Sequence, residues 1–310
     1  MKRGQVIQST GANYLVEVDD KIYNCTIRGR LRLADSRETN PVAVGDFVEL
    51  EIISEDEGVI TEIEERKNCI IRKSTNLSKE SHVIAANIDQ AVFIHTLKNP
   101  ETTTVFMDRF LAAAESYSIP PLIIFNKIDI YTREEIEEVA MLMAVYEDIG
   151  YKVIPTSIVK NQNLELVKKA LKDKVNVIAG HSGTGKSSLI NAISPGLNLK
   201  TASISKTHLT GRHTTTFATM HKLSFGGAVI DTPGIRAFGL VYLNKEETGH
   251  YFPEIFKMSH NCHFGNCLHI NEPNCAVKPA VESGEIAYSR YLSYLNIVLS
   301  EEDKHRTKLS

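Results

Sequence analysis

The sequence lacks any long apolar segment. No run of apolar residues approaches the roughly 20 residues that an α-helix needs to cross a bilayer. The opening residues, MKRGQVIQSTGANYL, also lack the apolar core of a secretory signal. We therefore expect no association with a membrane, and a cytoplasmic location follows by default.

The sequence also lacks a strong excess of charge and contains little cysteine. A formal net charge of −3 argues against a uniformly basic nucleic-acid-binding protein, although it is compatible with a local basic face. Five cysteines in an expected cytoplasmic protein do not indicate a disulfide framework. Cys25 and Cys69 stand alone in strand-like segments, so we predict that they are small core residues.

The composition predicts a globular protein of more than one domain. The chain has 310 residues, and 42% hydrophobic with 24% charged residues suffice for a substantial core. Changes of pattern divide it into three expected domains, which cover residues 1–72, 73–241 and 242–310. In the last of these, a final amphipathic helix is predicted from the apolar residues between 286 and 298.

The first domain is rich in predicted strands. Runs with many β-branched residues alternate with turn residues, and the predicted strands cover 4–8, 13–18, 21–27, 46–53 and 58–63. Five strands in so short a segment predict a small OB-like or SH3-like barrel. The polar stretch 72–81 is the expected joint to the next domain.

A basic stretch in the first domain has two interpretations. It contains Lys21, Arg28, Arg30 and Arg32, with no acidic residue among them. These side chains form either a solvated strand and loop surface or a patch that contacts RNA phosphates. The sequence favours neither interpretation over the other.

In the second domain, strands alternate with helices. The predicted strands cover 91–96, 121–126, 152–157 and 175–180, and the predicted helices cover 102–117, 132–148 and 164–171. This alternation predicts a parallel, doubly wound α/β sheet. Ligands of such sheets bind at the carboxyl ends of the strands, where the motifs described next are found.

The segment GHSGTGKS at 180–187 fits the pattern of a phosphate-binding loop, G-x-x-x-x-G-K-S/T. Its glycines allow backbone N–H groups to surround phosphates at the start of a helix. Lys186 is expected to reach the β- and γ-phosphates, and Ser187 to offer its hydroxyl to Mg²⁺. The predicted nucleotide-binding residues of this loop are Gly180, His181, Ser182, Gly183, Thr184, Gly185, Lys186, Ser187 and Ser188.

The segment Asn126-Lys127-Ile128-Asp129 indicates guanine rather than adenine. The Asp129 carboxylate can accept hydrogen bonds from the N1–H and the exocyclic amine of guanine, which adenine does not offer. Asn126 and Lys127 would brace the loop and pack on the base. Thr156 and Ser157, which end the next predicted strand, suit the backbone segment that closes over guanine.

Two further segments are expected to sense the γ-phosphate. In the segment DTPG, Asp231 is predicted to lie near Mg²⁺ and the N–H of Gly234 near the γ-phosphate. A threonine of the preceding polar loop is expected to complete the Mg²⁺ shell; Thr215 is preferred, and the alternatives are Thr210, Thr214 and Thr216. Ile235 stands where many GTPases have the glutamine that orients the attacking water, so another group must orient it.

The order of these motifs indicates a circular permutation. The base-recognition segment precedes the phosphate-binding loop, whereas it follows that loop in ordinary GTPases. The termini of compact domains often lie close together, so joining them and opening the chain elsewhere preserves the same sheet. Here the opening falls after DTPG, which ties this segment covalently to the third domain.

A close-spaced set of cysteines and histidines in the third domain predicts a metal site. Cys262, Cys267, His269 and Cys275 form the pattern C-x4-C-x-H-x5-C, which suits one structural, tetrahedral zinc. Four protein ligands leave no open position, which argues against a catalytic metal. The competing ligands are His260 and His263. His263 ranks below His269 because residues next to each other in the chain, as His263 and Cys262 are, seldom point at one metal.

Together these motifs resemble those of the RsgA (YjeQ) family, which are circularly permuted GTPases that depend on the small ribosomal subunit. The resemblance spans essentially the whole chain and rests on GRLR, NKID, GHSGTGKSS, GRHTTT, DTPGIRAFGL and the Cys3His pattern. It implies an OB-like barrel that binds RNA, a permuted P-loop GTPase domain and a small helical zinc domain. It further implies that GTP is hydrolysed to GDP with Mg²⁺, that the 30S subunit stimulates this hydrolysis, and that the protein acts in late maturation of that subunit in contact with its 16S rRNA. We expect a monomer.

The resemblance, with the absence of glutamine at position 235, points to His213 of GRHTTT as the residue that orients the attacking water. The competing interpretation is a solvent-exposed loop histidine. The expected catalytic residues are therefore His213, Lys186 and Thr215.

Two other functions are compatible with parts of the sequence. A P-loop ATPase or nucleotide kinase would use the same phosphate loop, but NKID argues against it. An RNA-binding scaffold that holds GTP with negligible turnover is compatible with Ile235, which predicts slow intrinsic hydrolysis. Comparing GTP with ATP, and hydrolysis with and without 30S subunits, distinguishes the three.

Overall fold

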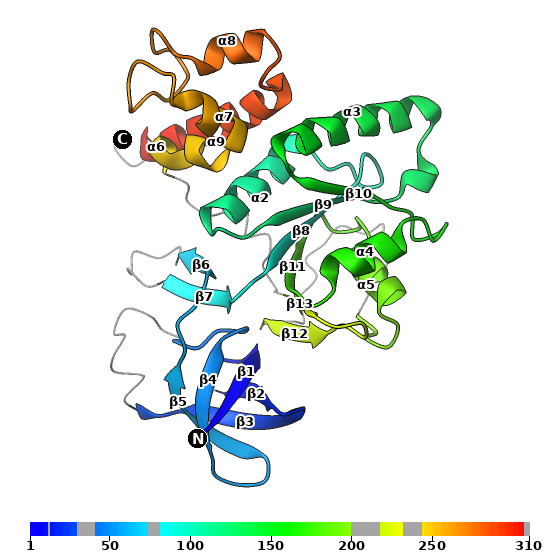
Figure 1. Cartoon of the computed structure of the whole chain (residues 1–310), viewed down its shortest axis with the longest axis vertical. Coiled ribbons are helices and arrows are strands. Elements are labelled where there is room, and N and C mark those ends of the chain that lie inside the picture. Colours follow the sequence, from blue (N-terminus) through cyan, green and yellow to red (C-terminus); the bar gives the residue numbers. More distant parts are fainter. Residues whose placement is uncertain (12, 30–40, 74–80, 200–217, 232–243, 307–310) are drawn as a thin grey trace. The chain divides into compact units, whose positions relative to one another are not determined.

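The computed structural model describes residues 1–11, 13–29, 41–73, 81–199, 218–231 and 244–306 (Figure 1). The chain forms two compact units. The first contains Met1–Val92, Asn163–Ala179 and Gly185–Val241, and the second contains Phe93–Gln162, Gly180–Thr184 and Tyr242–Ser310. Among the helices of the described ranges, none combines the length and the apolar character that crossing a membrane requires.

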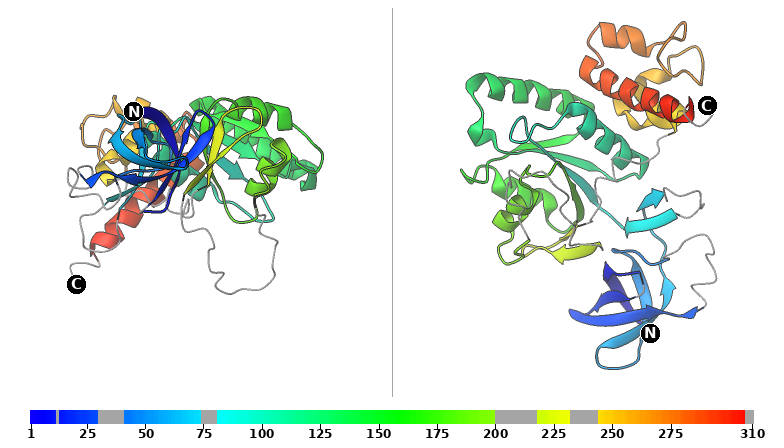
Figure 2. Two further views of the ribbon diagram at one scale, coloured as in Figure 1. Left: turned by 90° about the horizontal axis from the view of Figure 1, so that it is seen from below. Right: turned by 180° about the vertical axis from the view of Figure 1, so that it is seen from behind.

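The first unit contains the predicted barrel, and its five predicted strands are confirmed. They are β1 (Lys2–Ser9), β2 (Tyr14–Val18), β3 (Lys21–Ile27), β4 (Phe47–Ile52) and β5 (Glu57–Ile63). The strand order is β1-β2-β3-β5-β4, and β4 also pairs with β1, which closes the barrel. Among the described strand pairs of the barrel, only β3–β5 is parallel. Figure 2 shows these strands from two other directions.

Alternation of apolar and polar residues produces the core of the barrel. Successive side chains of a strand point to opposite faces, so every second residue is buried. Val6, Val16, Leu50 and Ile60 are fully buried in this core. The prediction for Cys25 is confirmed, since it is fully buried and burial raises the pKa of its thiol to about 11.

The basic stretch of the barrel is partly neutralised by acidic side chains. Arg28 pairs with Glu51 at 3.3 Å, and Lys21 lies 3.9 Å from Asp56. These are exposed pairs, whose contribution to stability is small. The other two basic residues that the sequence singled out, Arg30 and Arg32, lie outside the described residues.

The first unit also contains strands that the sequence did not predict. β6 (Cys69–Lys73) and β7 (Ser81–Ala86) form an antiparallel pair, so the domain boundary expected at residue 72 falls inside a strand. Cys69 is half-buried rather than part of the core, because β6 pairs with β7 alone among the described strands. β12 (Thr219–Lys222) is antiparallel both to β13 (Ala228–Asp231) and, at Gln8↔Thr219, to β1.

The rest of the first unit belongs to the predicted α/β sheet. β11 (Val175–Ala179) is parallel to β13, and the described order of this part is β8-β11-β13-β12. Its helices are α4 (Leu164–Leu171) and α5 (Lys186–Ile193). Because β11 and β13 are parallel, their carboxyl ends, Ala179 and Asp231, lie at the same edge of the sheet.

The second unit also contains strands that alternate with helices. Its strands lie in the order β10-β9-β8, and they are β8 (Gln90–His95), β9 (Pro121–Phe125) and β10 (Lys152–Pro155). β8 contributes its last residues to this unit, and all its residues are buried, as its continuous apolar run predicts. The helices are α2 (Thr104–Ser116) and α3 (Arg133–Ile149), with the short helix η1 (Ile128–Ile130) between β9 and α3. A capping box of Thr132 and Glu135 begins α3.

The carboxyl-terminal part of the second unit is helical. Its helices are α6 (Lys245–Thr248), η3 (Gly249–Tyr251), α7 (Pro253–Ser259), α8 (Val277–Glu282) and α9 (Tyr288–Arg306). α9 packs on α2 (Figure 1). Ile286 was predicted to lie in the last helix but precedes it: its N–H donates to the Ala280 carbonyl at 3.0 Å, so this residue closes α8 instead.

Candidate functional site

The base-recognition segment is held against the phosphate-binding loop through Asn126. This residue follows β9 and is fully buried. Its side-chain amide donates to the carbonyl of Thr184 at 2.8 Å and accepts from the Thr156 hydroxyl at 3.2 Å. Asn126 therefore braces the loop that carries Asp129 against residues 180–184, as the sequence predicts.

Lys127 makes a second connection to the same loop. Its ammonium donates to the carbonyl of Gly183 at 2.7 Å and to the carbonyl of Asn99. The residue has a left-handed backbone conformation, with φ 64°. Burial lowers the pKa of Lys127, because part of its solvation is lost. Two carbonyl oxygens replace that water, so the side chain works here as a brace between loops.

The orientation of Asp129 is fixed by Ser157. The Ser157 hydroxyl donates to Asp129 Oδ1 at 2.6 Å, and it accepts from the N–H of Lys160 at 3.0 Å. Thr156 and Ser157 are both fully buried, and the Thr156 carbonyl accepts from the N–H of Ile128 at 3.2 Å. The segment after β10 thus contacts the base-recognition loop through both backbone and side chain.

Glycines shape the phosphate-binding loop. Gly180, Gly183 and Gly185 all have positive φ, at 143°, 89° and 96°. At Gly180 a Cβ atom would lie 2.5 Å from the carbonyl oxygen of Ile94, which no side chain tolerates. Thr184 is fully buried, and its hydroxyl donates to the His181 carbonyl at 3.0 Å. These backbone conformations are of the kind that a phosphate-binding loop requires.

The remaining predicted phosphate and magnesium residues lie in the first unit. Gly185 is the N-cap of α5, and the half-buried residues Lys186, Ser187 and Ser188 form its first turn. Asp231 is the last residue of β13. The predicted switch residues lie outside the described residues; they are Thr210, His213, Thr214, Thr215, Thr216, Gly234 and Ile235.

Some contacts around the phosphate-binding loop could not be predicted from the sequence. His181 stacks on Phe106 of α2, with ring centroids 4.2 Å apart and planes at 22°. Asn99 and Pro100, in the loop between β8 and α2, approach Lys127 and Gly183. No motif marks these residues, because their role depends on where α2 packs.

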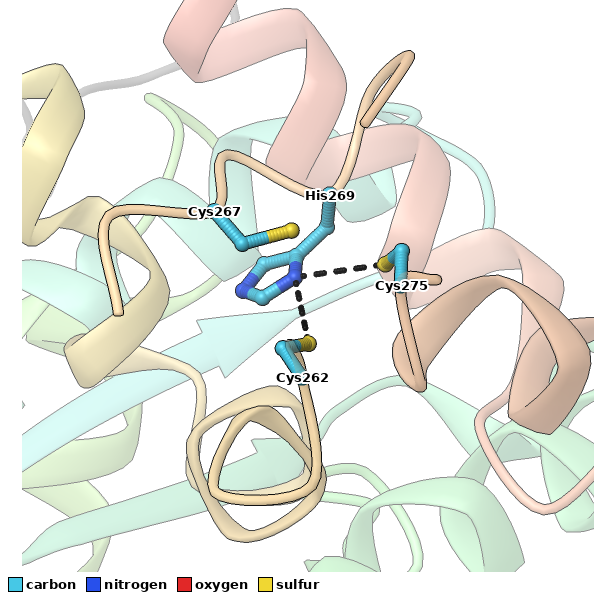
Figure 3. Close-up of side chains that lie close together, drawn as sticks. All are labelled: Cys262, Cys267, His269 and Cys275. Carbon is cyan, nitrogen blue, oxygen red and sulfur yellow. Dashed lines mark hydrogen bonds between the residues drawn. The ribbon is translucent and has the colours of Figure 1, made fainter. Parts of the chain in front are cut away.

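The four predicted metal ligands lie together in the second unit (Figure 3). The sulfur atoms of Cys262, Cys267 and Cys275 and the Nδ1 atom of His269 all lie within 4.8 Å of one another. His269 Nδ1 is 3.6 Å from Cys262 Sγ and 3.5 Å from Cys275 Sγ. Zinc bonds at a tetrahedral angle place nitrogen and sulfur ligands about 3.6 Å apart. The donors and their spacing therefore fit one tetrahedral zinc.

The competing histidines do not belong to this cluster. Among the described residues, only the four predicted side chains gather in a group that could bind a metal here. His260 contacts the Phe256 ring, and His263 lies edge-on to Phe264, and both histidines are exposed.

Burial shifts the pKa values of two of these side chains in opposite directions. It raises the pKa of the Cys267 thiol to about 12, and the neighbouring thiols Cys275 and Cys262 add to this effect. It lowers the pKa of His269, which keeps the imidazole neutral as metal binding requires. Binding of zinc must therefore release thiol protons.

The loop that carries the ligands is supported by residues that the sequence analysis did not identify. The Glu272 carboxylate accepts from the N–H groups of Leu268, Ile270 and Asn271 at 2.9, 2.9 and 3.1 Å. From α9, the Tyr291 hydroxyl donates to the His269 carbonyl at 2.6 Å, and the Tyr294 hydroxyl donates to the Leu268 carbonyl at 2.7 Å. Such partners fix the direction in which a ligand points.

Comparison with known proteins places the motifs in a family. The model of the RsgA GTPase family matches residues 63–241, and that of the RsgA N-terminal domain matches residues 3–60. The chain belongs to the RsgA GTPase family. It is therefore a GTPase, an enzyme that hydrolyses GTP.

Relatives within the family match over almost the full length. A small ribosomal subunit biogenesis GTPase RsgA from Christiangramia forsetii is 51% identical over 308 residues, covering 98% of both chains. A Bacteroides fragilis protein of the same name is 49% identical over 306 residues, which cover 98% of this chain and 99% of the relative.

Solved structures support the permuted fold. The crystal structure of YjeQ from Thermotoga maritima superposes with a TM-score of 0.81 at 35% identity, covering 96% of this chain and 98% of that one. YloQ, a circularly permuted GTPase, superposes with a TM-score of 0.76 at 34% identity, covering 98% and 96%. The permuted order inferred from the motifs is thus confirmed.

Proposed function

We propose that this GTPase acts in late maturation of the 30S ribosomal subunit and hydrolyses GTP when it contacts that subunit. The main support for a guanine-nucleotide site is that the NKID segment directly contacts the phosphate-binding loop. The contacts are the hydrogen bonds Asn126–Thr184 and Lys127–Gly183. The relatives named above carry small ribosomal subunit biogenesis in their names, which supports the assignment to ribosome maturation.

Recognition of the base is assigned to Asp129. With Oδ1 held by Ser157, the carboxylate is oriented to accept from the N1–H and the amine of guanine. The backbone of Thr156 and Ser157 closes the other side of the base. An adenine ring offers no matching donors, which is why we favour GTP over ATP.

We assign binding of the nucleotide's phosphates to residues 180–188. The backbone N–H groups of the glycine-rich turn bind oxygen atoms, Lys186 neutralises charge on the β- and γ-phosphates, and Ser187 and Asp231 hold Mg²⁺. When bound, Mg²⁺ would stabilise the negative charge that develops on the phosphates during hydrolysis. The segment DTPG ends at Gly234, whose N–H is assigned to the γ-phosphate, and Thr215 is assigned to complete the Mg²⁺ shell.

The metal cluster is assigned one structural zinc. Cys262, Cys267, His269 and Cys275 would occupy all four tetrahedral positions, so no position remains for a reacting water. We assign the barrel, residues 1–72, to contact with 16S rRNA, because small barrels of this kind present a strand face to nucleic acid. Action on the ribosome implies a cytoplasmic protein, and we propose that it acts as a monomer.

The test of the proposed function is GTP hydrolysis with and without 30S subunits. We expect slow release of phosphate by the protein alone, because Ile235 cannot orient a water, and stimulation by at least about tenfold on addition of 30S subunits. The control is Lys186→Ala, which should be inactive in both conditions. Equal rates with and without subunits, in a protein that binds GTP, would instead support the scaffold that holds GTP.

The residue that we assign to water orientation gives a second prediction. His213→Ala should retain binding of GTP and of 30S subunits but lose most of the stimulated hydrolysis, by roughly 100-fold, since general acid–base or positioning groups contribute on that order. Phosphate release and 30S co-sedimentation are measured on the same variant. Stimulation equal to that of the parent protein would mean that the subunit supplies the catalytic group.

A further inference from the structure

A buried arginine joins the carboxyl-terminal helices to the GTPase part of the second unit. Arg290 of α9 is 1% exposed. Its Nη1 atom donates to Asp108 Oδ1 of α2 at 2.6 Å, and its Nε donates to Glu254 Oε1 of α7 at 2.7 Å. Asp108 is fully buried and also accepts from the Tyr146 hydroxyl at 2.7 Å.

Such an arrangement fixes a position more than it adds stability. Burial of a charge costs free energy, and a buried ion pair recovers it only with good geometry and further hydrogen bonds. The Arg290 guanidinium has both, and it also lies 4.5 Å from the centre of the Phe252 ring. The directions of its hydrogen bonds leave α2 little freedom to slide along α9.

The helix held by Arg290 also touches the phosphate-binding loop. Phe106 of α2 stacks on His181, with ring centroids 4.2 Å apart. Phe106 and Asp108 are two positions apart, and such side chains leave a helix in nearly opposite directions. α2 is therefore held on one side by Arg290 and contacts the loop on the other.

We propose that Arg290 is a positioning residue for nucleotide binding, which acts through α2 and the Phe106–His181 stack. The aromatic stack fixes His181, the second residue of the loop, and Arg290 fixes the helix that carries Phe106. The backbone N–H groups that surround the phosphates are thereby held in place. This inference rests on the proposed guanine-nucleotide site, and it assigns that site a support 109 residues away in the chain, from His181 to Arg290.

The variants must remove the connection without leaving a buried charge. Arg290→Met alone would strand the buried Asp108 carboxylate and could prevent folding. Arg290 also pairs with Glu254, whose side chain is 11% exposed, so this carboxylate must be neutralised as well. The triple variant Arg290→Met/Asp108→Asn/Glu254→Gln removes all three charges, and the amide oxygen at position 108 still accepts from Tyr146. Phe106→Leu removes the stack and keeps an apolar side chain. Tyr288→Ala, at an exposed position of α9, is the matched control.

Affinity for a fluorescent GDP analogue is the measurement. We expect Phe106→Leu and the triple variant Arg290→Met/Asp108→Asn/Glu254→Gln each to weaken binding about three- to tenfold, the range that one aromatic pair contributes. Because the Arg290 contacts and the Phe106–His181 stack act in series, all four substitutions together should weaken binding no more than the stronger of the two variants. Parental affinity in the charge-free triple variant, or losses that multiply when the substitutions are combined, would overturn the proposal.

Hydrogen exchange on the parent protein tests the same connection without substitutions. Coupling between sites is reciprocal, so GDP should slow amide exchange in α2 and in α9 around Arg290 but not in β4 and β5. Unchanged exchange in α9 on binding of GDP would contradict the proposal. A parent protein that binds no guanine nucleotide would instead overturn the proposed function, so the two failures are distinguishable.

Discussion

Replacing Asp129 with asparagine is expected to weaken GTP binding by about two to three orders of magnitude and to create binding of xanthosine triphosphate. The carboxylate makes two charge-assisted hydrogen bonds to guanine in the proposed site, and each contributes about 1.5–3 kcal/mol. In the Asp129→Asn variant the side-chain oxygen can still accept from Ser157, whose hydroxyl is 2.6 Å from Asp129 Oδ1 in the parent protein. The new amide NH2 then faces the base, where xanthine offers a carbonyl and guanine an amine.

Equilibrium binding of both nucleotides measures this prediction. Asp148→Asn changes an exposed acid of α3 and should bind GTP as the parent protein does. Thermal unfolding checks that the variant is folded, because a general loss of structure would weaken the binding of both nucleotides alike. If Asp129→Asn keeps the guanine affinity of the parent protein, NKID does not read the base.

Replacing Cys267 with serine is expected to remove zinc and unfold the carboxyl-terminal helices. The parent protein should contain one zinc per chain, and the variant none. Structural zinc contributes directly to folding, by about 10–16 kcal/mol in small zinc-binding peptides. The loop between Cys262 and Cys275 has little apolar core of its own, with His269 and Cys275 its buried ligands. Without the metal this loop loses its main cross-link.

Metal analysis and limited proteolysis measure this outcome. Cys69→Ser is the control, because Cys69 lies in β6, outside the cluster, and is half-buried. GTP binding should largely survive in Cys267→Ser, weakened at most by the factor of about three to ten that we expect from loss of the Arg290 contacts. A parent protein that contains no zinc after purification without chelators would rule out the zinc assignment.

Much of the fold could be predicted because it depends on patterns of residues that are close together in the sequence. The five barrel strands followed from runs of β-branched residues between turn residues, and α2 followed from the helical spacing of its apolar residues. The phosphate loop, NKID and the Cys3His set follow from fixed spacings that chemistry requires. The permuted order needed only the sequence of these motifs along the chain.

Other elements could not be predicted, because they have no strong local pattern. β12 has only four residues, and its pairing with β1 and β13 comes from the packing of the first unit. The β6–β7 pair flanks the polar stretch that we expected to join two domains. Ile286 fits a helical spacing, yet the turn after α8 decides its conformation.

The amino-acid sequence by itself determined which chemical groups this protein has and in which order: the NKID segment, the glycine-rich segment GHSGTGKS and the Cys3His set. Only the tertiary structure decided what holds them. Asn126 meets Thr184, Ser157 orients Asp129, and Arg290 reaches Asp108. These partners are 28 to 182 residues apart. A contact at such a distance depends on how whole elements pack, and no periodicity of neighbouring residues encodes that.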